Sequence, residues 1–159
     1  MTVALLHGFA GDPSAWDEVI AAVGRAQQGL PGGHEGLLEQ WRATSADEHA
    51  RRCVLAHYLA DGEPELADEV AWDELALREH ALLDDDALTA IGIPSARAMA
   101  PSLHLNLADG YRRSGLVADA EVQLAAGLAA SDALGDDGYG RMVRGGLERL
   151  AEQLAAVGE

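Results

Sequence analysis

Apolar residues recur at intervals of three and four over most of this chain, and glycine and proline separate the segments that carry the pattern. Because an α-helix completes a turn about every 3.6 residues, such positions form an apolar stripe along one side of a helix. The stripe is clearest in residues 139–157, where it consists of Val143, Leu147, Leu150, Leu154 and Val157. The same reasoning predicts helices over residues 46–60, 65–83, 95–113 and 117–134.

The ends of these predicted helices carry residues with known roles at helix termini. Ser45 and Glu48 form a capping-box pattern, in which each side chain accepts a hydrogen bond from the backbone amide of the other residue. Gly115 follows a predicted helix and is expected to end it with a positive φ. Glycine also stands between the other segments, at Gly62, Gly92, Gly135 and Gly138.

The first 36 residues show a different pattern. Residues 3–6 are a short apolar run that predicts a buried strand. Asp12 and Pro13 predict a helix start, because aspartate is a good N-cap and proline suits the first helical position. The glycines of residues 29–36 predict a flexible loop or linker. We therefore divide the chain into an N-terminal segment, residues 1–36, and a helical domain, residues 37–159.

The helical domain contains an internal repeat. Tyr58, Gly62 and Ala67 recur as Tyr111, Gly115 and Ala120, each at an offset of 53 residues (111 − 58). Each copy consists of a helix, a glycine turn and a helix, and this arrangement resembles the tetratricopeptide repeat over about residues 46–134. The second copy matches that repeat best, at Leu107, Ala108, Tyr111, Gly115, Ala120 and Leu124.

The resemblance implies a mainly α fold of antiparallel helix pairs, with residues 139–157 as a capping helix. Small residues are expected where the helices of a pair cross, and the tyrosine is expected to pack against the next helix. Such repeats bind peptides in a groove, so the resemblance implies a protein or peptide partner. The usual spacing of roughly 34 residues is exceeded here, which indicates an insertion around residues 83–99.

A second resemblance covers only the start of the chain. Residues 3–9 read Val-Ala-Leu-Leu-His-Gly-Phe, with Gly11 and Trp16 following, and this order resembles the opening of α/β-hydrolases, closest to small lyases and esterases. It implies an oxyanion loop at His7, Gly8 and Phe9, whose backbone N–H groups stabilise a developing negative charge.

The rest of the hydrolase pattern is missing from the sequence. No serine has glycine two residues before it, and Cys53 follows two arginines, so the Gly-x-Ser-x-Gly elbow that carries the nucleophile is absent. We therefore expect a non-enzymatic binding module without esterase activity. The alternative is a hydrolase-related esterase or lyase fragment that is active only when another chain supplies the missing elements.

Composition and charge narrow the classes of partner. The 159 residues carry a net charge of −16, and every basic residue is arginine. This charge repels nucleic acids and anionic membrane surfaces, and the composition is typical of a GC-rich bacterial genome. No segment has the length of a membrane span or the pattern of a signal peptide, so we expect a cytoplasmic protein. The apolar strand at residues 3–6 favours possible self-association.

Four residues are candidates for contact with a partner. Asn106, the one asparagine of the chain, and Arg113 are seven residues apart and therefore lie on the same face of a helix. That face either lines the groove or is a solvated surface, and the solvated surface is the more common case. Arg52 and Arg112 belong to two Arg-Arg pairs that could clamp a ligand carboxylate. The alternative is that these arginines pair with acids on their own helices, such as Glu48 and Asp109.

A metal site is a weaker alternative. His49, Cys53 and His57 stand at i, i+4 and i+8, so they lie on one face of a helix, and their side chains are of the types that bind zinc or copper. The outer two are about 12 Å apart along the axis at the helical rise, which is too far for one ion. We therefore predict no metal and no cofactor, and expect a partly buried helix face. Trp41 and Trp72 are expected to anchor the core.

Overall fold

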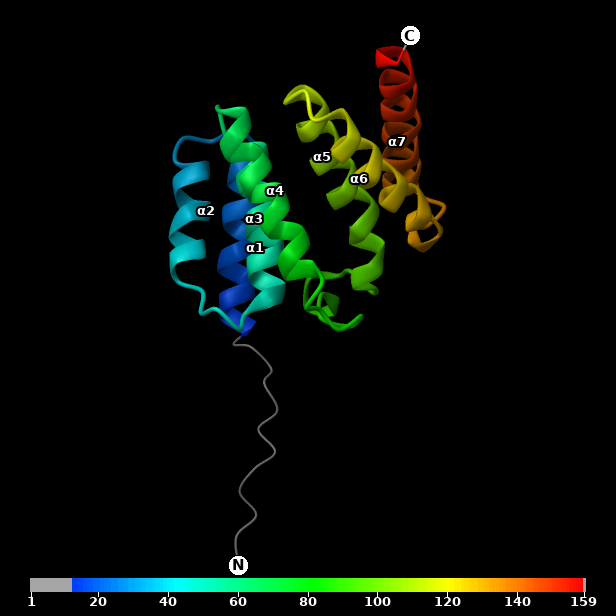
Figure 1. Ribbon diagram of the computed structural model, residues 1–159. Coiled ribbons are helices and arrows are strands. Elements are labelled where there is room, and N and C mark those ends of the chain that lie inside the picture. The colour runs from blue at the N-terminus through cyan, green and yellow to red at the C-terminus, as the bar shows by residue number, and fades with distance from the viewer. Residues whose placement is uncertain (1–12, 159) are drawn as a thin grey trace, which may run out of the picture.

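The computed structural model describes residues 13–158, and this part of the chain is built from helices, without strands (Figure 1). Its α-helices are α1 (Pro13–Gln27), α2 (Gly33–Arg42), α3 (His49–Asp61), α4 (Leu66–His80), α5 (Ala100–Arg113), α6 (Val117–Ala129) and α7 (Gly138–Val157). Short 3₁₀ helices are η1 (Thr89–Ile91), η2 (Ala96–Met99) and η3 (Ser131–Ala133). The prediction of a mainly α fold is confirmed.

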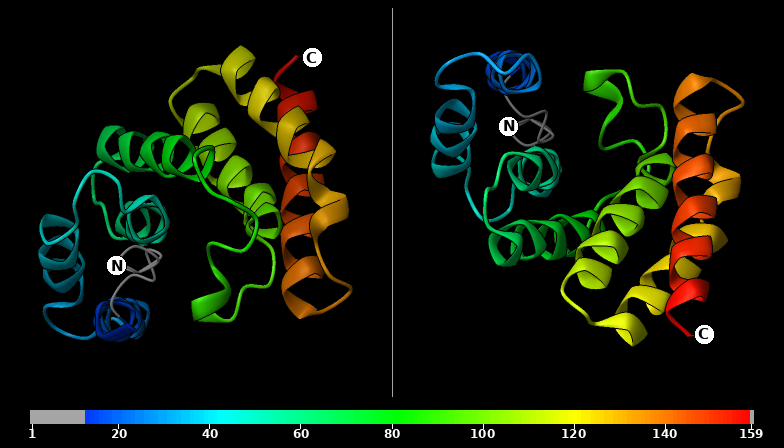
Figure 2. Two further views of the ribbon diagram at one scale, coloured as in Figure 1. Left: turned by 90° about the horizontal axis from the view of Figure 1, so that it is seen from below. Right: turned by 90° about the horizontal axis from the view of Figure 1, so that it is seen from above.

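Consecutive helices form packed pairs that follow one another in an arc. The pairs are α1 with α2, α3 with α4 and α5 with α6, and α7 packs against both helices of the last pair. Figure 2 shows α1, α3, α5 and α7 toward the inner side of the arc, with α2 and α4 outside them. This arrangement is compatible with a helical repeat.

Two clusters of buried apolar side chains hold the pairs together. The first joins α1 to the start of α5, and includes Val19, Leu37, Leu55 and Leu103. The second joins α5, α6 and α7. Trp41 and Trp72 pack against the first cluster in an edge-to-face pair, with ring centroids 5.0 Å apart. The structure therefore places both tryptophans at the core, as predicted.

The glycine-rich stretch 29–36 contains a short turn and the start of α2, where the sequence predicts a linker. Gly29 and Gly32 form the turn with positive φ angles of 64° and 75°. Gly33 lies in the helix, and a Cβ on it would come within 2.7 Å of the Cα of Ala26. The glycine there permits close approach of α2 to α1. The predicted boundary after residue 36 falls inside α2.

Several helix ends differ from the predicted ones. The amide of Ser45 donates to Oε2 of Glu48 at 2.6 Å, but the Ser45 hydroxyl donates to Asp47, so only half of the capping box forms. Helix α3 consequently begins at His49 and not at residue 46. The predicted helix 95–113 is η2 followed by α5, and the predicted helix 117–134 is α6 followed by η3.

The segment between α4 and α5 is a packed part of the core. Leu88 is fully buried, and Ile91 and Ile93 pack against the cluster formed with α1 and α3. Nε2 of His80 lies 2.7 Å from the carbonyl oxygen of Ala96 and ties the end of α4 to this segment. Figure 2 shows the segment on the inner side of the arc. The insertion therefore covers part of the inner face.

The predicted strand at residues 3–6 and the oxyanion-type loop at His7, Gly8 and Phe9 lie outside the described residues. None of the helices in residues 13–158 combines the length and the apolar character needed to cross a membrane.

Replacement of Leu37 by alanine tests whether the first helix pair belongs to the core. Leu37 is fully buried, so Leu37→Ala is expected to lower the free energy of unfolding by about 2–5 kcal/mol. Leu82, which is 63% exposed, provides the matched control. Leu82→Ala should change the free energy of unfolding by less than about 0.5 kcal/mol. Urea unfolding measures both, and equal effects would contradict the packing described for α2.

Candidate functional site

Three cavities lie next to α3. Tyr58 of α3 lines the second and the third, and Asp61 of α3 lines the first and the third. The cavities therefore share α3 as a common wall. Their volumes are about 280, 570 and 570 Å³. We call them the polar pocket, the apolar pocket and the N-terminal pocket.

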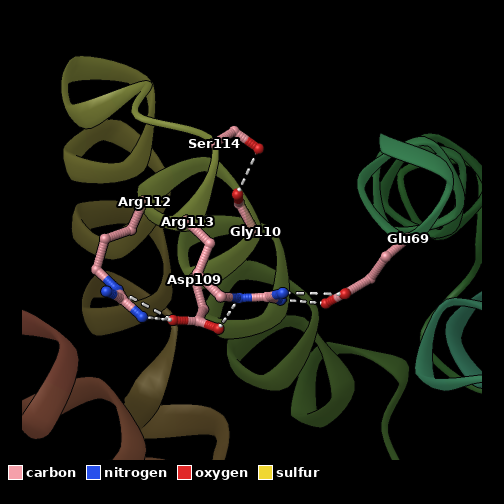
Figure 3. A network of polar contacts seen from close by, with 6 residues as sticks. All are labelled: Glu69, Asp109, Gly110, Arg112, Arg113 and Ser114. Carbon is pink, nitrogen blue, oxygen red and sulfur yellow. Dashed lines mark hydrogen bonds and ion pairs between the residues drawn. The ribbon is translucent and has the colours of Figure 1, made fainter. Parts of the chain in front are cut away.

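The polar pocket lies between the end of α3, the start of α4, and α5 and α7. It is lined by Asp61, Glu69, Leu105, Asn106, Asp109, Arg113, Gly146, Arg149, Leu150 and Gln153. Figure 3 shows that Arg113 extends from α5 toward Glu69 of α4. Its Nη1 donates to Glu69 at 3.1 Å, its Nη2 donates to the other oxygen of Glu69, and its Nε donates to Asp109 at 2.8 Å. Arg113 therefore ties α5 to α4 at the edge of the pocket.

Negative charge exceeds positive charge in the polar pocket. Three carboxylates, those of Asp61, Glu69 and Asp109, face two guanidinium groups, those of Arg113 and Arg149. The hydrogen bond to Glu69 raises the pKa of Arg113, and Asp109 adds to this. Partial burial raises the pKa of Asp61; the nearby His57 opposes this shift, and Glu69 adds to it. This pocket is therefore an environment that favours an additional cation.

A buried carboxyl group adjoins these charges. Asp73 of α4 is 2% exposed, and its Oδ1 has no hydrogen-bond partner in the described structure. Burial raises its pKa to about 8, and Glu69, Asp61 and Asp109 add to the shift while Arg113 opposes it. Asp73 is therefore largely protonated at neutral pH. Within residues 13–158, no three His, Cys, Asp or Glu side chains come together in a way that would hold a metal ion.

The structure brings together two of the four predicted contact residues. Asn106 and Arg113 both line the polar pocket. Arg112 points away from Arg113 and donates to the other side of Asp109, at 3.1 and 2.8 Å (Figure 3). The seven-residue spacing predicts the shared location of Asn106 and Arg113. It carries no information about Arg112, whose side chain binds the other oxygen of Asp109 and does not line the pocket.

Arg52 lies in a separate polar cluster, away from the residues that line the three pockets. Its Nε donates to Glu79 of α4 at 2.8 Å, and its guanidinium carbon lies 4.0 Å from the ring centroid of Trp41. The ion pairs of the alternative prediction form between Arg51 and Glu48, and between Asp109 and both Arg112 and Arg113. Arg52 uses its charge to join α3 to α4 and α2.

The three residues of the metal alternative occupy three different environments. Nδ1 of His49 lies 2.6 Å from Oε2 of Glu79. Cys53 is fully buried, and this burial, together with the charge of Glu79, raises the pKa of the thiol to about 12. Burial lowers the pKa of His57, against the effect of Asp61, and His57 lines the apolar pocket. A neutral buried thiol is a poor metal ligand, because metals bind the thiolate.

The apolar pocket has walls from four parts of the chain. These are α3, the insertion at residues 91–99, the start of α5, and residues 133–139 before and within α7. Most of its lining side chains are apolar, including Val54, Ile91, Ile93, Pro94, Met99 and Leu134. Tyr139 is 47% exposed, and its hydroxyl donates to Oγ of Ser102 at 2.9 Å. The side chain of Asp137 accepts from the amide of Gly140 at 2.8 Å and fixes the start of α7 beside Tyr139.

Sequence reasoning missed this pocket, although one signal points to it. The long spacing between the two repeat copies shows that an insertion is present, but not that it packs on the inner face. Ser102 and Tyr139 are 37 residues apart in the sequence, and only the packing of α7 on α5 brings them into contact.

Comparisons of this chain with protein families, with curated proteins and with solved structures find no match. Its chemistry is therefore inferred from the geometry of the pockets. An acceptor-rich pocket next to an apolar one suits recognition of an amphipathic ligand.

The buried Asp73 predicts a pH-dependent stability. The folded protein keeps this proton up to about pH 8, whereas the unfolded chain releases it near the ordinary pKa of 3.8. The free energy of unfolding is therefore highest at low pH, where Asp73 is protonated in both states, and it falls as the pH rises toward 8. Between pH 6 and pH 8, the wild-type protein should lose on the order of 2 kcal/mol of unfolding free energy relative to Asp73→Asn.

Urea unfolding of both proteins at pH 6, 7 and 8 measures this difference. The exposed Asp86 provides a control, because Asp86→Asn should leave the pH dependence of the wild type unchanged. Parallel pH profiles for wild type and Asp73→Asn would show that Asp73 is ionised in the folded protein.

The buried thiol of Cys53 makes a second prediction. Because the side chain is inaccessible and its pKa is about 12, the folded protein should react with dithionitrobenzoate at pH 8 at least a hundredfold more slowly than the unfolded protein. Absorbance at the wavelength of the released thiolate, with and without urea, measures both rates. Rapid stoichiometric labelling of the folded protein would contradict the burial of this helix face.

Proposed function

We propose that this chain is a non-enzymatic helical module that binds a peptide segment of a partner protein along the inner side of its helices. The observation that carries the proposal is that α3 lines all three pockets. Helices α5 and α7 also line the polar and the apolar pockets, and α1 and α2 also line the N-terminal pocket. A row of adjoining pockets suits an extended ligand better than a single compact one, and ligand sites occur preferentially between packed helices.

We also propose that α3 with α4 and α5 with α6 are two degenerate tetratricopeptide-like units. In support of this, Ala108 and Ala120 are fully buried where α5 and α6 cross, and Gly115 ends its helix with a φ of 78°. The two copies differ at the other glycine. Gly62 has a φ of −97°, and a Cβ there would lie 2.6 Å from Nδ1 of His34. Glycine is needed at position 62 because α2 approaches closely there, and at position 115 because the backbone has a positive φ.

The two repeated tyrosines also differ in their surroundings. The hydroxyl of Tyr111 donates to Glu74 of the preceding pair at 2.7 Å, so this residue joins α5 to α4. Tyr58 instead lines the apolar and the N-terminal pockets. Under the proposed function, the first tyrosine packs against the core and also forms part of the binding surface.

Selection of random peptides displayed on phage tests the proposal. Peptides enriched on the wild-type chain should bind at least tenfold more weakly to Asn106→Trp, because the indole would fill the polar pocket that Asn106 lines. Glu121→Trp, at an exposed position of α6, provides the control and should bind as the wild type does. Fluorescence anisotropy of the synthesised peptides gives the dissociation constants.

Two outcomes would contradict the proposed function. One is that no peptide is enriched on the folded wild-type chain. The other is that enriched peptides bind equally to the wild type and to Asn106→Trp, since they would then bind outside the inner surface.

A further inference from the structure

We propose that the partner segment carries a large apolar side chain and, two or three residues away, a lysine or an arginine. The apolar side chain would occupy the apolar pocket, and the basic side chain would occupy the polar pocket beside Asp61. This inference rests on the proposed function and specifies the chemistry of its ligand.

The spacing between the two positions follows from α5. Ser102 lines the apolar pocket, whereas Asn106 and Asp109 line the polar pocket. Asn106 and Asp109 follow Ser102 by four and seven positions on the same side of the helix, which corresponds to roughly 6–10 Å at the helical rise. An extended chain advances about 3.3–3.6 Å per residue, so the two pockets are two to three peptide residues apart.

Helix α3 gives the same order independently. Val54 and His57 line the apolar pocket, and Asp61 lines the polar pocket, again four to seven residues further along the helix. Both helices therefore present the apolar pocket nearer their N-terminal ends and the polar pocket nearer their C-terminal ends. A ligand that extends along α3 and α5 meets the two environments one after the other.

Charge complementarity selects the basic side chain. Arg113 already engages Glu69 and Asp109. Asp61 is exposed and forms no ion pair within residues 13–158; His57 is close enough to lower its pKa, and Arg149 lines the same pocket. A guanidinium or ammonium group beside Asp61 would interact favourably with its carboxylate, and the carboxylates that line the polar pocket outnumber its guanidinium groups. The chain as a whole carries a net charge of −16, which further favours a basic partner.

The apolar pocket selects the other side chain. Its volume of about 570 Å³ accommodates a side chain as large as that of phenylalanine or tryptophan. Its polar side chains, those of His57, Tyr58, Ser95, Ser102, Asp137 and Tyr139, include one carboxylate, whereas three carboxylates line the polar pocket. Burial lowers the pKa of His57, which favours the neutral ring beside an apolar group.

Short labelled peptides test the proposal. The probe is fluorescein-Gly-Ser-Phe-Ser-Ser-Arg-Gly-Ser, compared with two analogues in which Arg is replaced by Glu or Phe by Ser. Fluorescence anisotropy with the wild-type chain should show binding of the probe and at least tenfold weaker binding of each analogue. Equal affinity for all three peptides, or no binding of the probe, would overturn the proposal.

Variants of the chain assign each half of the probe to its pocket. Asp61→Arg should weaken binding of the Arg probe at least tenfold and should strengthen binding of the Glu analogue, a reversal that loss of folding cannot produce. Ala98→Trp, which would fill the apolar pocket, should abolish the preference for Phe over Ser. Glu121→Gln, which removes one negative charge at an exposed position of α6 outside the three pockets, should leave all affinities unchanged. Failure of the Asp61→Arg reversal would contradict the placement of the basic side chain.

The peptides selected on phage separate this inference from the proposed function. We call a peptide groove-dependent when it binds more weakly to Asn106→Trp than to the wild type. If such peptides lack an apolar residue two or three positions from a basic one, the proposed function stands and the inference is overturned. Absence of any groove-dependent peptide would overturn both.

Discussion

The structure depends on close approach between helices that carry glycine or alanine where they meet. A Cβ on Gly127 of α6 would lie 2.8 Å from Cδ2 of Leu147, and one on Gly146 of α7 would lie 2.6 Å from Cδ2 of Leu105. A larger residue at either position would displace a leucine side chain from the contact between α7 and its neighbours, where the side chains set the interhelical distance. The small number of aromatic residues in the chain is consistent with helices that pack closely through small side chains.

The arc of helices and the inserted segment together define the binding surface. Close packing of α7 on α5 brings Arg149 near Asn106 and Tyr139 near Ser102. The insertion, through Leu88 and its neighbours, covers part of the inner face of α1 and α3 and leaves pockets in place of an open groove. Ion pairs such as Arg113 with Glu69 hold adjacent pairs together at the edge of this surface.

Local patterns in the sequence predict the helices and part of the candidate site. The seven-residue spacing of Asn106 and Arg113 places both in one pocket, since helical periodicity needs no tertiary information. The partner of Arg52 is Glu79, 27 residues away, and only tertiary packing reveals it. Only tertiary packing also reveals that Asp73 is buried, because its position in the sequence resembles any charged position on a helix. Likewise, the sequence does not show that Gly33 permits the contact of α2 with α1.

The most direct test of the central claim is to locate a bound peptide on the folded chain. Backbone amide resonances of the isotope-labelled protein would be followed by NMR while a phage-selected peptide is added. The account predicts that the largest shift changes occur on the inner helices, at residues such as Asp61 of α3, Asn106 of α5 and Gly146 of α7. Shift changes confined to the exposed faces of α2, α4 and α6 would contradict it.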